Sequence, residues 1–207
     1  MIIELLGVPA CGKSTYVKMY SMKNNVIAPL DMYLYNASRL KQNMNKIKLI
    51  IYAFLYKRYE FLKYNHLINK INFQSFNKRM KMWLYLFSIL GAKWKAENRF
   101  PKHTIILDEG INQVIWGILY NEQDSIEAVW TLQKELLTEM GEKIVYLKVS
   151  ESVLDKRLKS RRSNGGSELE HDIKKNTTIL KKSIHLVDEI IEHLNMYGVH
   201  IYIENNQ

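Results

Sequence analysis

A short stretch near the N-terminus, "GVPACGKST" at residues 7–15, combines the residue types that bind phosphate. Gly7 and Gly12 let the backbone turn several N–H groups toward one point, and Lys13 adds a mobile cation. Ser14 places a hydroxyl where phosphate-binding loops ligate Mg²⁺. The spacing fits the pattern G-x-x-x-x-G-K-[ST], so this loop is predicted to bind the β- and γ-phosphates of a nucleotide.

The sequence on either side supplies the context that this pattern requires. An apolar run at 2–6 predicts a buried strand, and 13–22 has a helical pattern whose N-terminus would face the anion. Within the loop we expect Cys11 to be a small structural residue rather than a nucleophile, and Thr15 to lie near the α-phosphate. The residues expected to hold the nucleotide are Gly7, Ala10, Cys11, Gly12, Lys13, Ser14 and Thr15.

Carboxylates follow two further apolar runs. Asp108 ends "TIILD" at 104–108, and the carboxyl ends of parallel strands open onto the same crevice. We therefore expect Asp108 and Ser14 to hold the magnesium ion, with Glu109 as a carboxylate that faces the substrate or positions water. Asp31 follows the run at 26–30. It is either the base that takes the proton of an acceptor hydroxyl or a turn or helix-capping residue.

Basic residues gather after the apolar run at 143–149. Arg157 and Arg161 lie four residues apart on one helical face, Arg162 adjoins them, and two glycines follow shortly after. This pattern is typical of a lid, expected at about 157–168, that closes on a triphosphate and stabilises the transferring phosphoryl group. A solvated helix end is the alternative. Adenine contacts are expected from Asn205 and Asn206.

Apolar runs alternate with helical patterns along much of the chain, which predicts an α/β parallel sheet covered by helices on both faces. Glu4 lies inside the first run, and we expect it either to pair with a basic group or to lie at an exposed strand end. The expected strands are 2–6, 26–30, 104–108, 143–149 and 199–203. The expected helices are 13–22, several within 37–98, about 122–140, 151–162, and 168–196, the last with a capping box at Ser167 and Glu170.

The motifs "IIELLGVPACGKST", "TIILDEG" and "YLKVSESVLDKRLKSRR" resemble, in this order, those of the P-loop kinases of the adenylate, thymidylate and shikimate kinase group. The resemblance covers roughly 1–35 and 103–207. It implies a five-stranded parallel sheet of order 2-3-1-4-5, a helical substrate-binding insert, a lid after strand four, and phosphoryl transfer from ATP. Asp31 takes the place of the aspartate base of the shikimate kinase relatives. "DEGINQ" departs from the Asp-Arg or Glu-Arg-Ser pattern of many nucleoside and nucleotide kinases.

The segment 36–102 differs in composition from the rest of the chain. From Arg39 to Lys102 there are 15 Lys and Arg residues against two acids, a net charge of +13, whereas the whole chain carries +9. This segment is expected to be a basic helical insert that binds an anionic substrate, with Arg39 among the contacts, in one domain of 207 residues. Its aromatic and apolar stripes are expected to be core, although a membrane-surface helix is an alternative.

These observations favour an ATP- and Mg²⁺-dependent kinase that phosphorylates a small hydroxyl-bearing acceptor, expected to be anionic. Lys13, Asp31, Arg157, Arg161 and Arg162 would be catalytic. One alternative is a nucleoside or nucleotide kinase. A P-loop NTPase whose insert binds single-stranded nucleic acid is another, disfavoured because no recognised nucleic-acid motif is present. With one cysteine and no signal peptide, the expected location is the cytoplasm.

Overall fold

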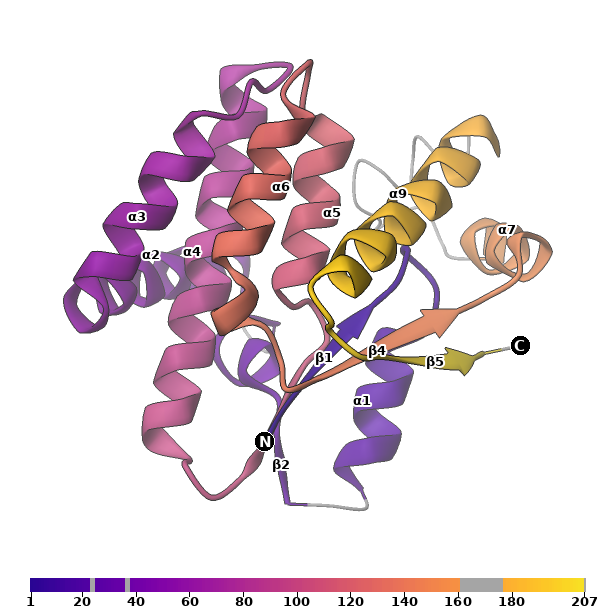
Figure 1. Cartoon of the computed structure of the whole chain (residues 1–207). Coiled ribbons are helices and arrows are strands. Elements are labelled where there is room, and N and C mark those ends of the chain that lie inside the picture. The colour runs from indigo at the N-terminus through magenta and orange to yellow at the C-terminus, as the bar shows by residue number, and fades with distance from the viewer. Residues whose placement is uncertain (23–24, 36–37, 161–176, 207) are drawn as a thin grey trace.

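Five parallel strands form the centre of the molecule in the order β2-β3-β1-β4-β5 (Figure 1), as the sequence predicts. The computed structural model describes residues 1–22, 25–35, 38–160 and 177–206. The strands are β1 (Ile2–Leu6), β2 (Val26–Ile27), β3 (Thr104–Leu107), β4 (Lys143–Lys148) and β5 (Ile201–Asn205). All four strand pairings are parallel, so the carboxyl ends of the strands share one edge.

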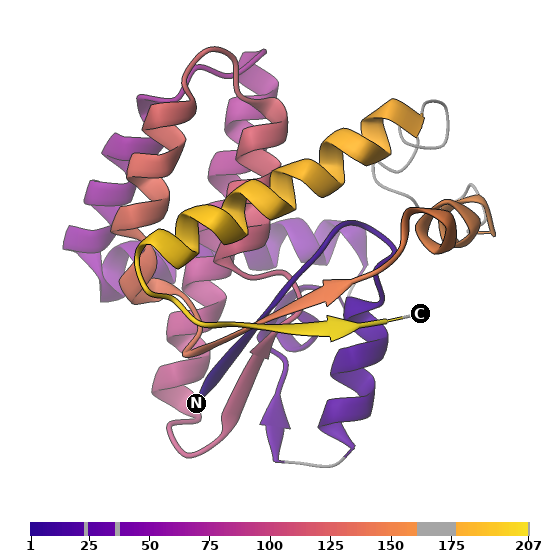
Figure 2. The same ribbon diagram turned by 45° about the vertical axis from the view of Figure 1, so that its right-hand side comes forward.

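The central strands are apolar because both of their faces are covered. All five residues of β1 are buried, and the inner residues of β3 and β4 are buried as well. Helix α1 (Lys13–Ser21) covers one face of the sheet, while α5 (Ile111–Asn121) and α9 (Thr177–Met196) lie on the other (Figures 1 and 2). Trp116 of α5 donates its indole N–H to the carbonyl of Ser183 in α9, at 2.9 Å, which joins the two helices.

The segment between β2 and β3 is almost entirely helical. It contains the π-helical turn η1 (Asp31–Tyr35), then α2 (Arg39–Tyr56), α3 (Arg58–Asn69) and the long α4 (Phe76–Arg99). Helix α4 packs against α2 on one side and α5 on the other, and α3 packs on α6 (Ile126–Glu135). The 3₁₀ turn η2 (Leu137–Glu139) follows α6, and α7 (Glu151–Ser160) follows β4.

Glu4 lies in the middle of β1 and is fully buried, so the expectation of an exposed strand end is wrong. The positive charge of Lys93 does act on Glu4, but the direct hydrogen-bond partners are backbone groups. The Glu4 carboxylate accepts hydrogen bonds from the backbone N–H groups of Asn112 and Gly141. Burial raises the pKa of Glu4 above its ordinary value, and these hydrogen bonds oppose the shift. A Cβ atom at Gly110 would overlap the Glu4 side chain, which explains the glycine before α5.

Several element boundaries differ from those expected. The strand expected at 26–30 ends at Ile27, and the expected strands 104–108, 143–149 and 199–203 are found at Thr104–Leu107, Lys143–Lys148 and Ile201–Asn205. Pro29 has no N–H to donate to a ladder, which accounts for the early end of β2. The helix expected at about 122–140 is found as α6 and η2, and α5 was not expected. Ser167 and Glu170, the expected capping box, lie outside the described residues.

Candidate active site

The loop between β1 and α1 has the backbone form of a phosphate-binding turn. Gly12 has a φ of 105°, and Ala10 also has a positive φ, of 67°. Residues with a side chain rarely adopt the backbone conformation of Gly12, and a Cβ atom there would overlap the side-chain amide of Asn206. Ser14 and Thr15 are exposed in the first turn of α1, where backbone N–H groups lack acceptors within the helix. This helix end can therefore receive an anion.

Lys13 folds back over the loop. Its ammonium donates to the carbonyl of Gly7 at 2.6 Å and makes a longer contact of 3.4 Å with the carbonyl of Val8. The side chain is partly buried, so its charge is held over the turn rather than released to solvent. A phosphate bound to the loop amides would lie within reach of this cation.

Asp108 follows β3 directly and is buried, with 8% of its surface exposed. The pKa of Asp108 is raised from 3.8 to about 6, chiefly by burial and in addition by the negative charges of Glu109 and Asp31. The positive charge of Lys13 acts in the opposite direction. The structure thus brings Lys13, Asp31, Asp108 and Glu109 close enough to interact electrostatically, although they come from three separate parts of the chain.

Asp31 does not end a strand. It lies four residues beyond the end of β2 and begins the π-helical turn η1, where it is partly exposed. Its charge nevertheless acts on Asp108, so it still faces the carboxyl edge of the sheet. A partly exposed carboxylate there could receive a proton from a bound hydroxyl.

Glu109 lies next to Asp108 and is held by the basic segment. Its carboxylate accepts a hydrogen bond of 2.8 Å from the phenol of Tyr85 in α4. This contact ties the helical insert to the carboxyl end of β3. Sequence reasoning missed Tyr85, because a tyrosine within an apolar helical stripe gives no signal that distinguishes a site residue from a core residue.

Arg157 reaches the loop from α7. Its guanidinium lies 3.5 Å from the carbonyl of Ala10 and 3.4 Å from that of Cys11. The amide of Asn206 donates to the same Cys11 carbonyl at 2.7 Å. Arg161 and Arg162 lie outside the described residues, as does the side chain of Arg39, which begins α2.

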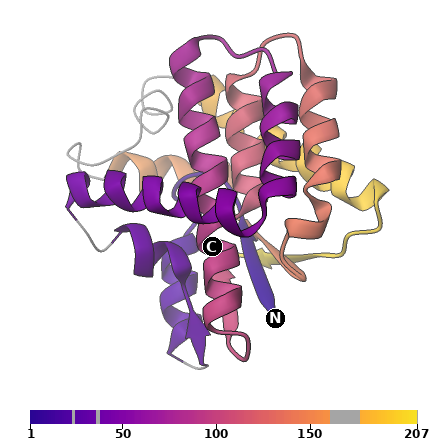
Figure 3. The ribbon, with the colours of Figure 1, turned by 90° about the vertical axis from the view of Figure 1, so that its left-hand side faces the viewer.

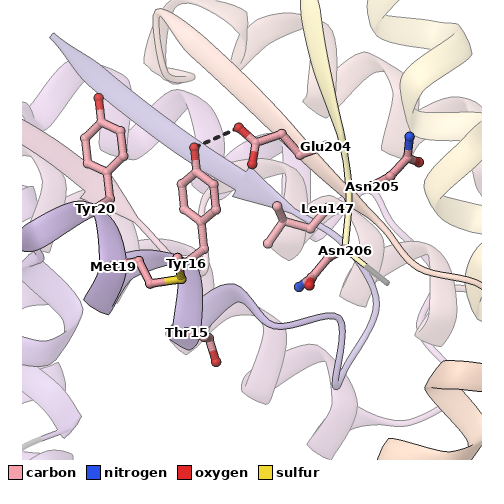
Figure 4. Close-up of a pocket in the computed structure, with 8 residues that line it drawn as sticks. All are labelled: Thr15, Tyr16, Met19, Tyr20, Leu147, Glu204, Asn205 and Asn206. Atoms are coloured by element: carbon pink, nitrogen blue, oxygen red, sulfur yellow. Dashed lines mark hydrogen bonds between the residues drawn. The ribbon is translucent and has the colours of Figure 1, made fainter.

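A cleft of about 360 Å³ opens beside the loop, between α1 and the ends of β4 and β5 (Figure 4). Tyr16 spans it and donates a hydrogen bond of 3.1 Å to Glu204 of β5. Burial, followed by the charge of Glu204, raises the pKa of Tyr16 to about 12, so the phenol remains a donor at neutral pH. The cleft is lined by Thr15, Tyr16, Met19, Tyr20, Leu147, Glu204, Asn205 and Asn206.

The side chains near the loop fit a magnesium ion that is shared with phosphates. No group of three or more His, Cys, Asp or Glu side chains among the described residues could form a metal cage. Mg²⁺ in phosphoryl-transfer sites is usually held by one or two protein oxygens, by waters and by the phosphates themselves. The raised pKa of Asp108 reflects burial first and the neighbouring negative charges second, and a divalent cation beside the carboxylate would oppose both effects.

The sheet order, the glycine-bounded turn before α1 and the carboxylate after β3 together define the P-loop kinase fold. The chain has this fold. Among the described residues, no helix is both long enough and apolar enough to cross a membrane.

Nucleoside and nucleotide kinases are among the solved structures with this fold. Deoxyadenosine kinase from M. mycoides with bound dATP is 15% identical, with a TM-score of 0.53 over 100% of this chain and 91% of that one. The same enzyme with dCMP and a flexible dCDP bound gives a TM-score of 0.52. Thymidylate kinase from Candida albicans is 14% identical and gives a TM-score of 0.54, over 99% of this chain and 82% of that one. No family model and no curated protein matches the sequence.

Proposed function

We propose that this protein is a kinase that transfers the γ-phosphoryl group of ATP to a hydroxyl of a nucleoside-class acceptor. The observation that carries the proposal is that Lys13, Asp31 and Asp108 follow β1, β2 and β3, at the carboxyl edge of one parallel sheet. A cation on the donor phosphates, a carboxylate for the metal and a carboxylate for the acceptor are the parts that such a transfer needs.

Each of these side chains has a distinct role in the proposed reaction. The loop amides and Lys13 would hold the β- and γ-phosphates, and Ser14 and Asp108 would hold the ion. Magnesium, when bound, would neutralise charge on the phosphates and help align them for in-line transfer. Asp31 would accept the proton of the acceptor hydroxyl as the new P–O bond forms and the bond to ADP breaks. Arg157 would stabilise the charge on the transferring group.

The cleft beside α1 is proposed to receive the donor nucleoside. It adjoins the first turn of α1 through Thr15 and the loop through Asn206, which contacts the Cys11 carbonyl. A nucleotide whose phosphates occupy the loop would therefore direct its sugar and base toward this cleft. Its mixture of tyrosine rings and amides suits a planar base with polar edges.

The structural neighbours bear on the choice of acceptor. Deoxyadenosine carries no phosphate, so a kinase of that name must phosphorylate a hydroxyl. A hydroxyl acceptor requires a group that takes its proton, and Asp31 could be that group. Thymidylate kinase supports a second candidate, in which the acceptor is a nucleoside monophosphate. The net charge of +13 from Arg39 to Lys102 favours that candidate, because a phosphate acceptor is an anion.

Phosphorus NMR distinguishes the two candidates. The full chain is incubated with Mg-ATP and separate pools of nucleosides, deoxynucleosides and their monophosphates. We expect a new phosphomonoester from a nucleoside pool, and we expect Asp31→Asn to lower kcat by about 10²- to 10⁴-fold with ATP affinity unchanged. Asp124→Asn, at an exposed loop position, is the matched control. A diphosphate product and an unaffected Asp31→Asn variant would instead establish the monophosphate kinase.

A further inference from the structure

Helix α2 exposes a continuous apolar stripe. Figure 3 views the molecule from the side on which α2 and α3 form the outer layer. Along α2, five large apolar side chains are between 51% and 74% exposed. They are Leu40, Met44, Ile47, Ile51 and Leu55.

The spacing of these five residues places them on one face of the helix. They follow one another in steps of three or four residues, so they lie within an arc of roughly 80°. The opposite face of α2 supplies the packing, through the buried Leu49 and Ala53 and a close approach of the Leu49 carbonyl to Gly91 of α4. The stripe is therefore not required by the core, although stripes of this kind usually are.

The charged residues of α2 itself are all basic. Lys41 and Lys48 are exposed along one border of the stripe, and no Asp or Glu occurs between Arg39 and Tyr56. The next acid along the chain is Glu60, in α3. A helix with a narrow apolar face, a basic border and no acids has the features of helices that lie in the interface of an anionic bilayer.

We propose that α2 docks this protein on an anionic phospholipid surface, with the stripe among the upper acyl chains and Lys41 and Lys48 at the headgroups. The proposal is independent of the reaction proposed above. It assigns the membrane-surface role to the face of α2 that points away from α4, and it requires no helix to cross the bilayer.

Charge and side-chain type favour lipid over other occupants. A second copy of the chain paired through α2 would bring Lys41 and Lys48 near the same residues of its partner, and α2 offers no acid to compensate. Single-stranded nucleic acid binds by stacking its bases on aromatic rings, whereas the stripe is wholly aliphatic. An aliphatic stripe beside lysines is complementary to acyl chains beside acidic headgroups.

Vesicle flotation with the full chain tests the proposal. The probes are phosphatidylcholine vesicles and vesicles of phosphatidylcholine with phosphatidylserine. We expect the wild type to float with the anionic vesicles only, and less so at high salt. Ile47→Gln with Ile51→Gln, and separately Lys41→Glu with Lys48→Glu, should each reduce binding roughly tenfold or more.

Matched controls distinguish binding through this face of α2 from nonspecific hydrophobic or electrostatic binding. Met22→Gln with Met196→Gln removes two exposed apolar side chains elsewhere, and Lys18→Glu with Lys102→Glu makes the same charge change elsewhere. Both controls should bind as the wild type does. If the isoleucine variant showed no cooperative melting by circular dichroism, it would be unfolded, and the lysine variant would then test the proposal. Equal binding to both vesicle types, loss in the controls, or sedimentation showing a dimer that the isoleucine variant abolishes would each overturn the proposal.

Discussion

The proposed role of Asp108 conflicts with its surroundings in the fold. A carboxylate that serves a metal must be ionised, yet this one is buried and lies near two other carboxylates, so its pKa is raised to about 6. Without a cation beyond Lys13, the folded protein holds this group in an unfavourable state at neutral pH. Metal and nucleotide binding would remove that cost, which links ligand binding to stability at a single residue.

Replacing Asp108 with Asn should therefore stabilise the ligand-free protein. The pKa of Asp108 is about 6 in the folded protein and 3.8 in the unfolded chain. Between these pH values the folded state binds more protons than the unfolded state, so the free energy of unfolding falls as pH rises from about 4 to 6. At pH 7.5 we expect Asp108→Asn to raise the free energy of unfolding by about 3 kcal/mol. The gain should vanish near pH 3.5. Urea unfolding at the two pH values measures it.

The same variant should lose its magnesium-dependent affinity for ATP. Calorimetry on the wild type should also show proton release when Mg-ATP binds near pH 6, since binding would drive Asp108 to its ionised form. Glu142→Gln, at an exposed carboxylate, is the control for loss of an acidic group. A variant that is less stable at neutral pH yet binds Mg-ATP normally would show that Asp108 is a structural residue.

At the scale of elements, the strands were predictable and one of the helices was not. Strands β1, β3 and β4 are buried on both faces and therefore appear as short, largely apolar runs, although Glu4 interrupts the run of β1. Helix α5 is buried at every position from Ile111 to Leu119, so it has no exposed face, and the pattern of a short, largely apolar run does not distinguish a buried helix from a buried strand. Strand β2 was expected at 26–30 but has only two residues, Val26 and Ile27, so the apolar run located this strand without showing where it ends.

The phosphate-binding part of the candidate site was predictable, because its residues have a fixed spacing along the chain. Gly12, Lys13 and Ser14 are adjacent in the chain, so a local pattern identifies them. Tyr85 and Glu109, by contrast, are 24 residues apart and meet only because α4 packs beside the carboxyl end of β3. No local pattern records such a contact, since it depends on the tertiary arrangement.

The contact between α2 and α4 rests on Gly91. A Cβ atom at this position would overlap the backbone carbonyl of Leu49, which cannot move without displacing α2. Gly91→Ala should therefore destabilise the protein by roughly 2 kcal/mol, despite the higher helix propensity of alanine. The melting temperature measures the loss.

Gly117→Ala is the matched control for this change, because it lies inside a buried helix as well. Its Cβ would meet the flexible side chain of Met82 at 3.1 Å instead of a backbone atom. This variant should melt close to the wild type. If the two variants lost equal stability, the close approach of α2 to α4 would not be the cause.

For the whole molecule, a buried charge cluster joins the basic helical segment to the sheet domain. Glu139, in the turn before β4, accepts hydrogen bonds from Lys93 at 2.9 Å and from the indole of Trp94 at 2.6 Å, both in α4. Lys57, between α2 and α3, reaches the other carboxylate oxygen at 3.3 Å. Three donors from the insert thus converge on one acid of the core. Part of the segment's large positive charge is consequently structural and not available to a substrate.

The cluster should make the whole fold sensitive to acid. Burial alone would raise the pKa of Glu139, but the charge of Lys93 and the hydrogen bond from Trp94 outweigh it and hold the pKa below 4.5. A depressed pKa gives stability that is present above about 4.5 and lost as pH falls. The pH dependence from Glu139 is opposite to that from Asp108, whose contribution to stability falls as pH rises.

Glu139→Gln should destabilise the protein by about 3 kcal/mol at pH 7, because the buried Lys93 loses its shorter ion pair, of 2.9 Å, and keeps only the 3.3 Å pair with Glu97. Glu139→Leu combined with Lys93→Met should recover most of that loss, since apolar side chains of similar volume replace a buried ion pair at little cost. Urea unfolding of the three proteins at pH 7 and pH 4 measures both effects. The defect of Glu139→Gln should shrink at pH 4, where part of the wild-type contribution is lost. A double variant as unstable as Glu139→Gln, with no pH dependence, would mean that packing rather than charge holds the insert to the sheet.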